Sequence, residues 1–463
     1  MHKSLIALPL FLLCACSVGP DYTRPAVPAP DHWNVAYQAA AHLADARWWQ
    51  QFGDPVLDGL LETAVRENLD LRVAAARVDQ FLGVLETTRS QYYPQVSANY
   101  VGGPQRQSGQ PNESHQAAVN ASWELDLWGR IRRSNEAVQA QIIGSEAGRR
   151  GVLMTLLANV ASGYLTLRGL DRQLEVTRAT EWAYAESLKL LLLRFQYGTV
   201  SQLEVSQAES QYESARQSIP LYESQIRQQE NLLCLLLGSP PGPIPRGKSL
   251  DDLTPPDIPA GLPSALLERR PDIIQAEQTL IAANAQIGVA KAAYFPKISL
   301  TGLLGVASTD IGRLFAPGAD IWSTGGQAAM PILNFGSLSG QVKQAEAQKQ
   351  QALYQYRQAI LTGFREVEDA LIKTTKGREQ LEAQKRQVRS LEEYARLSRL
   401  QFEAGTANYL QVLDADRSLF SGRQVSNQTR ADLLAAIVSV YKAMGGGWVT
   451  EADKLNQPGE KQP

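Results

Sequence analysis

An internal repeat constrains the fold of this chain more than any single motif, because both copies must build the same kind of structure. Tyr92–Ser97 in the first copy matches Tyr294–Ser299 in the second, and Leu127–Gly129 matches Asn334–Gly336. The offset is 202 residues at the first match and 207 residues from the second match onward, so the second copy carries five extra residues between them. We therefore expect one supersecondary unit that occurs twice.

Stretches rich in proline divide the chain around the two copies. Pro and Gly are so frequent between residues 238 and 263 that neither a helix nor a central strand can continue through this stretch. Several prolines before the first copy likewise favour an extended chain there. We expect a signal peptide (1–15), an extended N-terminal segment (16–46), a first repeat (47–237), a connector (238–263), a second repeat (264–448) and a disordered tail (449–463).

The start of the chain has the layout of a cleaved secretory signal, with Lys3 before an apolar run that is too short to span a bilayer. Ala15-Cys16 follows that run and resembles the lipobox of bacterial lipoproteins. The resemblance implies cleavage before Cys16 and attachment of a diacylglycerol and an N-acyl lipid to this cysteine, with no other cofactor. Ser17 after it implies the outer membrane, and Cys234 has no partner for a disulfide within the chain.

Each copy contains a long helix with a coiled-coil seam, in which apolar residues recur at steps of four and three. The seam of the first copy consists of Leu153, Leu157, Val160, Tyr164, Leu167, Leu170 and Leu174, and that of the second includes Ile360, Phe364, Val367 and Leu371. No proline occurs between Gly129 and Arg194, so one helix of about 65 residues and roughly 100 Å is possible. Two shorter helices, broken near Gly148, Gly151 or Gly169, are the alternative.

Each copy also carries a strand pair, at about residues 94–127 and 296–333. Apolar residues from Val119 to Leu127 alternate with polar ones, so one strand face suits an apolar phase and the other suits water. Four strands cannot close a barrel, and open edges inside lipid leave backbone groups unsatisfied. Three chains that share one twelve-stranded barrel are the simplest solution, whereas the alternative, a soluble sandwich, needs about eight short strands and only four occur.

The composition and the histidines exclude several classes of function. The formal net charge of −2 gives no indication of nucleic-acid binding. All four histidines lie in the first quarter of the chain, and neither a G-x-S-x-G nor an H-E-x-x-H motif occurs, so we predict that the protein is not an enzyme. A lipid-anchored periplasmic coiled-coil tether is a further alternative, but it explains the helices and not the amphipathic strands.

Four motifs are specific in combination, namely Val18–Pro25, Trp48–Pro55, Arg269–Ile273 and Tyr441–Trp448. Together they resemble the TolC-like outer membrane factors, in particular the lipid-anchored efflux lipoproteins of tripartite pumps. The resemblance implies a mixed α/β homotrimer, in which a twelve-stranded outer-membrane β-barrel, with four strands per protomer, continues into an α-helical coiled-coil barrel across the periplasm.

The function that this resemblance implies is passive export. A periplasmic adaptor protein and an inner-membrane transporter of the resistance-nodulation-division type are the expected partners. Drugs or other toxic small molecules are the expected cargo, because they are the commonest cargo of the family. Efflux of metal ions and type I protein secretion are the alternatives.

The resemblance also implies a gate at the periplasmic end of the duct. In the matching segment, Leu410 would form an apolar ring and Asp414 an acidic ring, with Arg417 as a pairing partner. Steps of four and three place these three residues on one helix face, and a ring of carboxylates favours cations. Without the resemblance, the same residues suit an ordinary exposed helix, and Asp416 has no assigned role.

Two Gly-Thr pairs lie at equivalent places in the copies, Gly198-Thr199 and Gly405-Thr406. The resemblance implies that these helix turns face the adaptor and the transporter. A second interpretation is a C-terminal helix cap, since Gly readily adopts the left-handed conformation that such caps use. Both interpretations are compatible with the sequence.

Overall fold

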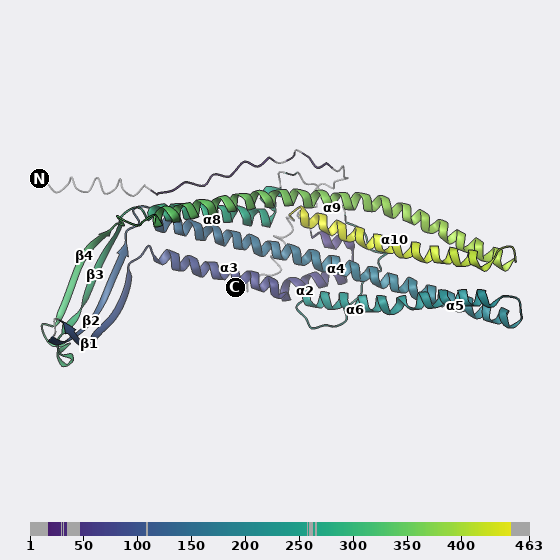
Figure 1. Cartoon of the computed structure of the whole chain (residues 1–463), viewed down its shortest axis with the longest axis horizontal. Coiled ribbons are helices and arrows are strands. Elements are labelled where there is room, and N and C mark those ends of the chain that lie inside the picture. The colour runs from purple at the N-terminus through teal and green to yellow at the C-terminus, as the bar shows by residue number, and fades with distance from the viewer. Residues whose placement is uncertain are drawn as a thin grey trace, which may run out of the picture. The chain divides into compact units, whose positions relative to one another are not determined.

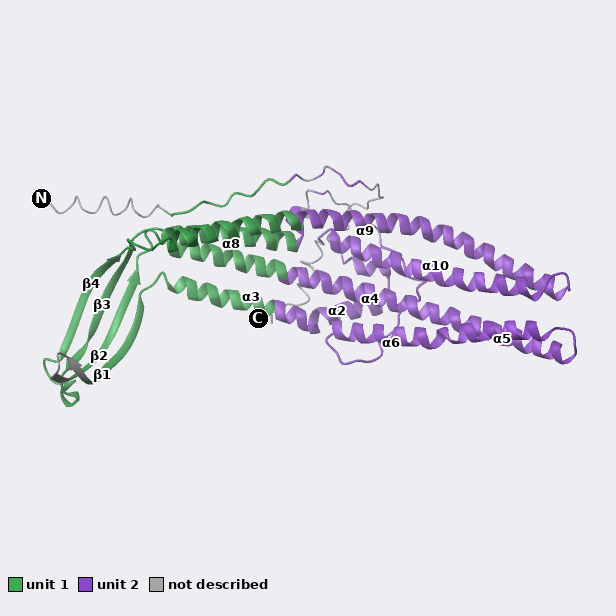
Figure 2. Ribbon diagram, in the orientation of Figure 1, with its two compact units in different colours: residues 1–27, 75–148, 272–359 green, residues 28–74, 149–271, 360–463 purple. Residues whose placement is uncertain are grey.

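The structure is a computed structural model, and it describes residues 17–28, 30, 32–34, 47–107, 110–256, 258, 263 and 266–445. The expected signal peptide, Cys16 and the expected tail lie outside these residues. The chain forms two compact units (Figure 2), of which unit 1 comprises residues 1–27, 75–148 and 272–359, and unit 2 comprises residues 28–74, 149–271 and 360–463. The boundary between the units falls within four helices.

Unit 1 contains one antiparallel sheet of four strands in the order β1-β2-β3-β4 (Figure 1). The strands are β1 (Gln95–Gln107), β2 (Gln110–Glu124), β3 (Lys297–Ser308) and β4 (Asp320–Ala329). The prediction of two strand pairs is confirmed, and pairing between β2 and β3 joins the pair of one copy to the pair of the other. The β3–β4 connection carries the short 3-10 helix η4 (Ile311–Arg313). Strands β1 and β4 remain as the two edges.

The register of the sheet separates an apolar face from a polar face, because successive residues of a strand point to opposite sides. The apolar face carries Val96, Ala98, Val119, Ala121, Leu300, Leu304 and Trp322. The opposite face carries Ser97, Asn99, Asn120, Ser122, Thr301 and Ser323. Large apolar side chains such as Leu304 and Trp322 are exposed in the single chain, as the sequence predicts for a face in contact with lipid.

The N-terminal residues 17–27 are held on the rest of unit 1 by polar side chains. Arg133, near the start of helix α4 (Arg130–Gln196), lies 2.6 Å from Asp21, measured from Nη2 to Oδ1. Glu277 of α8 (Pro271–Ala292) accepts hydrogen bonds from the Tyr22 hydroxyl at 3.0 Å and from Arg24 at 2.6 Å. Because the Glu277 side chain is nearly buried, these two donors offset the desolvation of its charge. This segment is therefore extended and fixed in place.

Two helices of 67 residues each, α4 (Arg130–Gln196) and α9 (Ser337–Glu403), confirm the prediction of continuous long helices. The alternative with a break at a glycine is wrong, because the glycines serve close packing within an intact helix. A Cβ atom at Gly169 would lie 2.8 Å from the Cβ of Ala431.

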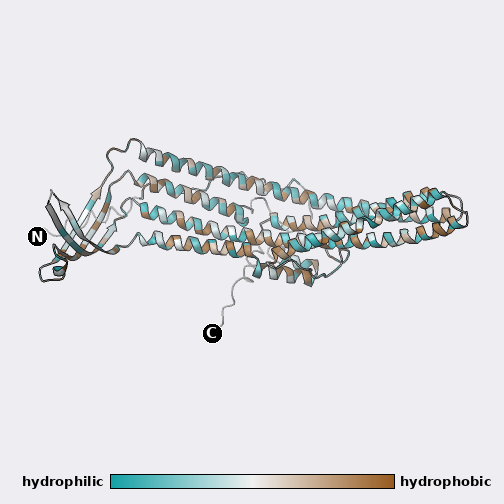
Figure 3. Cartoon of the chain, turned by 60° about the horizontal axis from the view of Figure 1, so that its bottom comes forward, coloured by the Kyte–Doolittle hydropathy of each residue, from teal (hydrophilic) through white to brown (hydrophobic). Residues whose placement is uncertain are grey.

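Hydrophobic and hydrophilic residues are interspersed along the long helices (Figure 3). None of the helices in the described ranges is both long enough and apolar enough to span a membrane.

Seven further helices complete the described structure. They are η2 (Trp48–Phe52), α2 (Pro55–Glu67), α3 (Leu69–Ser90), α5 (Gln202–Arg216), α6 (Ser218–Leu236), α7 (Leu266–Arg269) and α10 (Tyr409–Ala443). In unit 2, the first five seam residues of α4 are completely buried, from Leu153 to Leu167. Trp48 of η2 stacks on Tyr441 of α10, with 5.3 Å between the ring centroids, and both rings belong to this core.

A buried carboxylate connects three separate segments of unit 2. Asp54, which is completely buried, accepts a hydrogen bond at 3.0 Å from the backbone N–H of Val56 and so caps the start of α2. It also accepts from the Tyr164 hydroxyl at 2.8 Å and from the backbone N–H of Lys248 at 3.0 Å. The same hydroxyl accepts from the N–H of Gly247 at 2.9 Å. Tyr164 thus links the connector to α4 and to the start of α2.

Replacing Tyr164 by Phe should destabilise unit 2 by about 2 kcal/mol, because it removes a hydrogen bond to a buried carboxylate and leaves the Gly247 N–H without an acceptor. Far-UV circular dichroism of the protein in detergent, followed against guanidinium chloride concentration, measures this loss. Tyr354→Phe is the matched control, because Tyr354 lies exposed on α9. Equal stability of the two variants would contradict the role given to the Tyr164 hydroxyl.

Candidate functional site

The two Gly-Thr pairs end α4 and α9 with the same hydrogen-bonded cap. Gly198 and Gly405 both have a left-handed backbone, with φ of 71° and 72°. The N–H of Gly198 donates to Phe195 O at 2.9 Å, and the N–H of Thr199 donates to Arg194 O at 3.0 Å. This pair of bonds is the Schellman motif. The cap interpretation is confirmed by this geometry, while the docking of partners stays a prediction.

The cap of the second copy has the same bonds. The N–H of Gly405 donates to Phe402 O at 3.1 Å, and the N–H of Thr406 donates to Gln401 O at 2.9 Å. Asn408 then caps the start of α10, since its side chain accepts from the N–H of Gln411. Both helix turns are therefore compact, and each is closed by the same two backbone hydrogen bonds.

The start of α10 carries the predicted gate residues on its exposed side. Its other side packs into an apolar cluster with α4 and α5, which contains Leu191, Ala208, Tyr409, Val412 and Leu413. Leu410, Asp414 and Arg417 are all exposed in the single chain. The structure thus presents Leu410 and Asp414 together on one helix face, as their spacing predicts.

Asp414 and Arg417 each have a partner on another helix. The Asp414 carboxylate accepts a hydrogen bond from the Tyr394 hydroxyl of α9 at 3.0 Å. Arg417 donates from Nε to the side-chain oxygen of Gln211 on α5. Within the described part of the chain, no ion pair joins Asp414 to Arg417. In one copy of the chain, Arg417 therefore connects α10 to α5 and does not pair with the predicted acidic ring.

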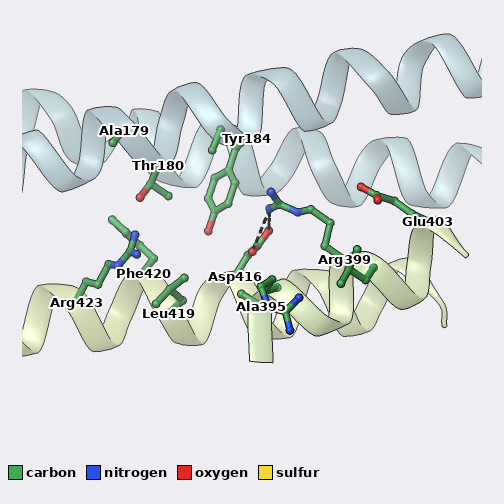
Figure 4. Close-up of a pocket in the computed structure, with 13 residues that line it drawn as sticks. Ala179, Thr180, Tyr184, Ala395, Arg399, Glu403, Asp416, Leu419, Phe420 and Arg423 are labelled. Atoms are coloured by element: carbon green, nitrogen blue, oxygen red, sulfur yellow. Dashed lines mark hydrogen bonds and ion pairs between the residues drawn. The ribbon is translucent and has the colours of Figure 1, made fainter. Parts of the chain in front are cut away.

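Asp416 is a largely buried charged residue to which sequence reasoning assigns no role. Its side chain is only 13% exposed and lies 3.1 Å from Nη2 of Arg399 on α9. The pair lines a cavity of about 460 Å³ into which Tyr184 of α4 and Phe420 of α10 also point (Figure 4). The sequence alone places Arg399 six residues before Gly405 and Asp416 eleven residues after it, so both lie near the tip of one helical hairpin, but this spacing does not pair them.

Burial controls the ionisation of this cluster. It raises the pKa of Asp416 above its usual range, although the Arg399 guanidinium opposes the shift. Burial likewise raises the pKa of Tyr184 and of Tyr409 to about 12, so both hydroxyls stay protonated at neutral pH. Arg396, Glu403 and Arg423 also line the cavity. The folded structure therefore favours the neutral form of Asp416 more than water does.

Comparison with known proteins decides the family. The chain matches the outer membrane efflux protein family over residues 60–239 and 262–446. It belongs to that family. The toluene efflux pump outer membrane protein TtgC of Pseudomonas putida is 37% identical, over 99% of this chain and 98% of the relative. The cation efflux system protein CusC of Escherichia coli O6:H1 is 34% identical, over 94% of this chain and 96% of the relative. A crystal structure of CusC has a TM-score of 0.84 and 33% identity, over 93% of this chain and all of that chain.

Family membership confirms the prediction of an outer membrane efflux channel protein with an internal repeat and four strands per chain. The two matched segments of the family correspond to the two copies of the repeat. Members of this family are channel proteins, so the protein is a channel and not an enzyme. Among the residues that the structure describes, no group of three His, Cys, Asp or Glu side chains could hold a metal ion.

Asp416→Asn should make the helix tip at least as heat-stable as the wild type at pH 7. Since the pKa of Asp416 is raised on folding, its contribution to stability is present at low pH and is lost as the pH rises through the folded-state pKa. The difference between variant and wild type should therefore shrink as the pH falls. Thermal unfolding at a series of pH values measures it, with Asp414→Asn as an exposed control on the same helix. A variant that is much less stable at pH 7 would show that the ion pair outweighs burial.

Proposed function

We propose that three copies of this chain form the exit duct of a tripartite efflux system, which conducts drugs or other toxic small molecules passively out of the cell. The four-stranded sheet carries this proposal, because it has one exposed apolar face and two unpaired edges. Pairing of β4 of one copy with β1 of the next removes every edge when the ring closes. With three copies, the ring has the twelve strands that the sequence predicts.

A lipid on Cys16 anchors the mature chain in the same proposal. The lipobox supports it, and so does the position of the residues that follow. The N–H of Val18 donates to Trp128 O at 3.0 Å, just beyond the end of β2. The described chain thus begins beside the strands, and each methylene of an acyl chain that enters the membrane adds about 0.8 kcal/mol to membrane binding. Labelling with palmitate, compared between wild type and Cys16→Ala, tests the anchor.

The periplasmic gate is the second part of the proposal. Leu410 of three copies forms an apolar ring, Asp414 forms an acidic ring, and Arg417 holds α10 against α5 through Gln211 in the closed state. Opening then requires α9 and α10 to move away from α4 and α5. The exposure of Leu410 and Asp414 supports this assignment, and so does the Gln207 that stands at the equivalent position of the first copy.

Asp414→Ala should lower the cation preference of the purified protein in planar bilayers and change its single-channel conductance, because three carboxylates leave the constriction. Gln207→Ala is the matched control, since it alters the equivalent position of the other copy and removes no charge. If the wild type conducts and Asp414→Ala leaves both quantities unchanged, the gate assignment is wrong.

The turns at Gly198-Thr199 and Gly405-Thr406 are the proposed docking sites for a periplasmic adaptor and an inner-membrane transporter of the resistance-nodulation-division type. Their compact, fully bonded caps support this role, because a rigid turn loses little entropy on binding. The exposed Tyr197 beside Gly198 adds an apolar contact surface at one of the turns. Aromatic side chains of this kind often anchor protein interfaces.

Thr199→Arg combined with Thr406→Arg should abolish drug resistance in cells and leave conductance in bilayers intact, because the bulky charges block docking but not the pore. A panel of drug, solvent and metal susceptibilities measures export, against a strain without the gene. Ser214→Arg on the shaft of α5 is the matched control. Unchanged resistance in the double variant would contradict docking at the turns.

The same panel distinguishes the classes of cargo. TtgC, named for toluene, and CusC, named for cations, have similar identities to this chain. The commonest family cargo and the slightly higher identity of TtgC favour organic compounds. Sensitivity to metal salts alone after deletion would instead favour cation efflux.

A further inference from the structure

The joint between strand β2 and helix α4 is packed within the chain. Trp128 stacks on Phe295, with 4.7 Å between the ring centroids and 24° between the ring planes. Its indole Nε1 donates to Pro296 O at 2.8 Å. The backbone N–H of Leu125 donates to Ile298 O at 2.9 Å and so extends the β2–β3 pairing to the joint. The residues just before β3 therefore cover the residues just after β2.

The equivalent joint of the second copy, between β4 and α9, has no such cover. The repeat offset of 207 residues places Phe335 where the first copy has Trp128. The Phe335 side chain is 98% exposed, and Ile332 and Leu333 beside it are also exposed. Phe335 is also the only non-glycine residue of the described chain with a positive φ, at 45°. A strained backbone at a bare aromatic residue persists only where surrounding structure holds it.

The first copy contains an aromatic residue that is also exposed and could pack against Phe335. The repeat places Tyr93 and Pro94 where the second copy has Phe295 and Pro296. The Tyr93 side chain is 68% exposed. Tyr93 precedes β1, and Phe335 follows β4, and these strands are the opposite edges of the sheet (Figure 1). The two rings therefore cannot meet within one chain as Trp128 and Phe295 do.

We propose that Phe335 of one copy stacks on Tyr93 of a second copy, in the same way that Trp128 stacks on Phe295 inside the chain. This inference rests on the proposed trimer and names the aromatic contact that forms wherever β4 meets β1 of the next copy. Phenylalanine has no ring N–H, so the contact between chains lacks the hydrogen bond that the indole of Trp128 makes to Pro296 O. The ring contact alone covers the bare joint and holds the left-handed backbone of Phe335.

Cross-linking tests the contact directly. In a Cys234→Ser background, Tyr93→Cys with Phe335→Cys should give species of two and three chain masses on denaturing gels after treatment with a short bismaleimide. Trp128→Cys with Phe295→Cys is the matched control and should remain at one chain mass, because that pair lies within one chain. A Tyr93–Phe335 product that stays at one chain mass would overturn the proposal.

Native gels and bilayer recordings of the Cys234→Ser parent separate this inference from the proposed function. A trimeric, conducting parent whose Tyr93–Phe335 variant is not cross-linked overturns the aromatic contact alone. A parent that is monomeric and does not conduct overturns the proposed assembly, and the contact with it.

Trimer stability gives a second test that needs no cysteine. Phe335→Ala should raise the dissociation constant of the trimer by up to about tenfold per contact at a fixed temperature, as expected for the loss of an aromatic pair. Phe335→Trp should restore the trimer. Phe315→Ala is the matched control, because Phe315 is 84% exposed in the β3–β4 connection and has no such partner in the proposal. Equal effects of Phe335→Ala and Phe315→Ala would contradict the contact.

Discussion

The unpaired edges of the sheet impose the constraint on which the rest of the structure depends. Each backbone N–H or C=O left without a partner inside lipid costs several kcal/mol, so a membrane sheet must have no edge. One chain provides four strands with an apolar face, and its β1 and β4 remain open. Only other copies can complete this sheet. The symmetry of the assembly, and with it the gathering of long helices around one axis, follows from that requirement.

The two copies of the repeat share their architecture but not their chemistry. Both contain a strand pair, a helix of 67 residues and a turn closed by Gly and Thr. The pair formed by Asp416 and Arg399 has no counterpart, because Glu209 and Leu192 stand at the equivalent positions. The joint after the strands differs as well, since a tryptophan is covered in one copy and a phenylalanine is bare in the other. The scaffold is duplicated, and the charges that would control passage belong to the second copy.

Local patterns predict the fold of this chain well, because each pattern depends only on which face of a single helix or strand is buried. The spacing of Leu153, Leu157 and Val160 predicts the helix seam, and the alternation after Val119 predicts the two faces of the sheet. The residues whose roles sequence reasoning misses make their contacts with residues far away in the sequence. The role of Asp54 depends on Tyr164 and on Lys248, and neither the hydrogen bonds of Asp54 nor the burial of Asp416 leaves a periodic signal. The pairing of β2 with β3 likewise emerges only in three dimensions.

The core of unit 2 also determines the order in which the chain can fold. Lys248 is separated from its acceptor Asp54 by 194 residues, and Trp48 stacks on Tyr441, which lies close to the other end of the chain. Contacts between residues so far apart in sequence form slowly, because a large loop must close before they are made. The first core residues to be synthesised can therefore complete their contacts only after the last helix has been made. A chain interrupted before α10 would leave Trp48 without its stacking partner, so the complete polypeptide is needed to finish this core.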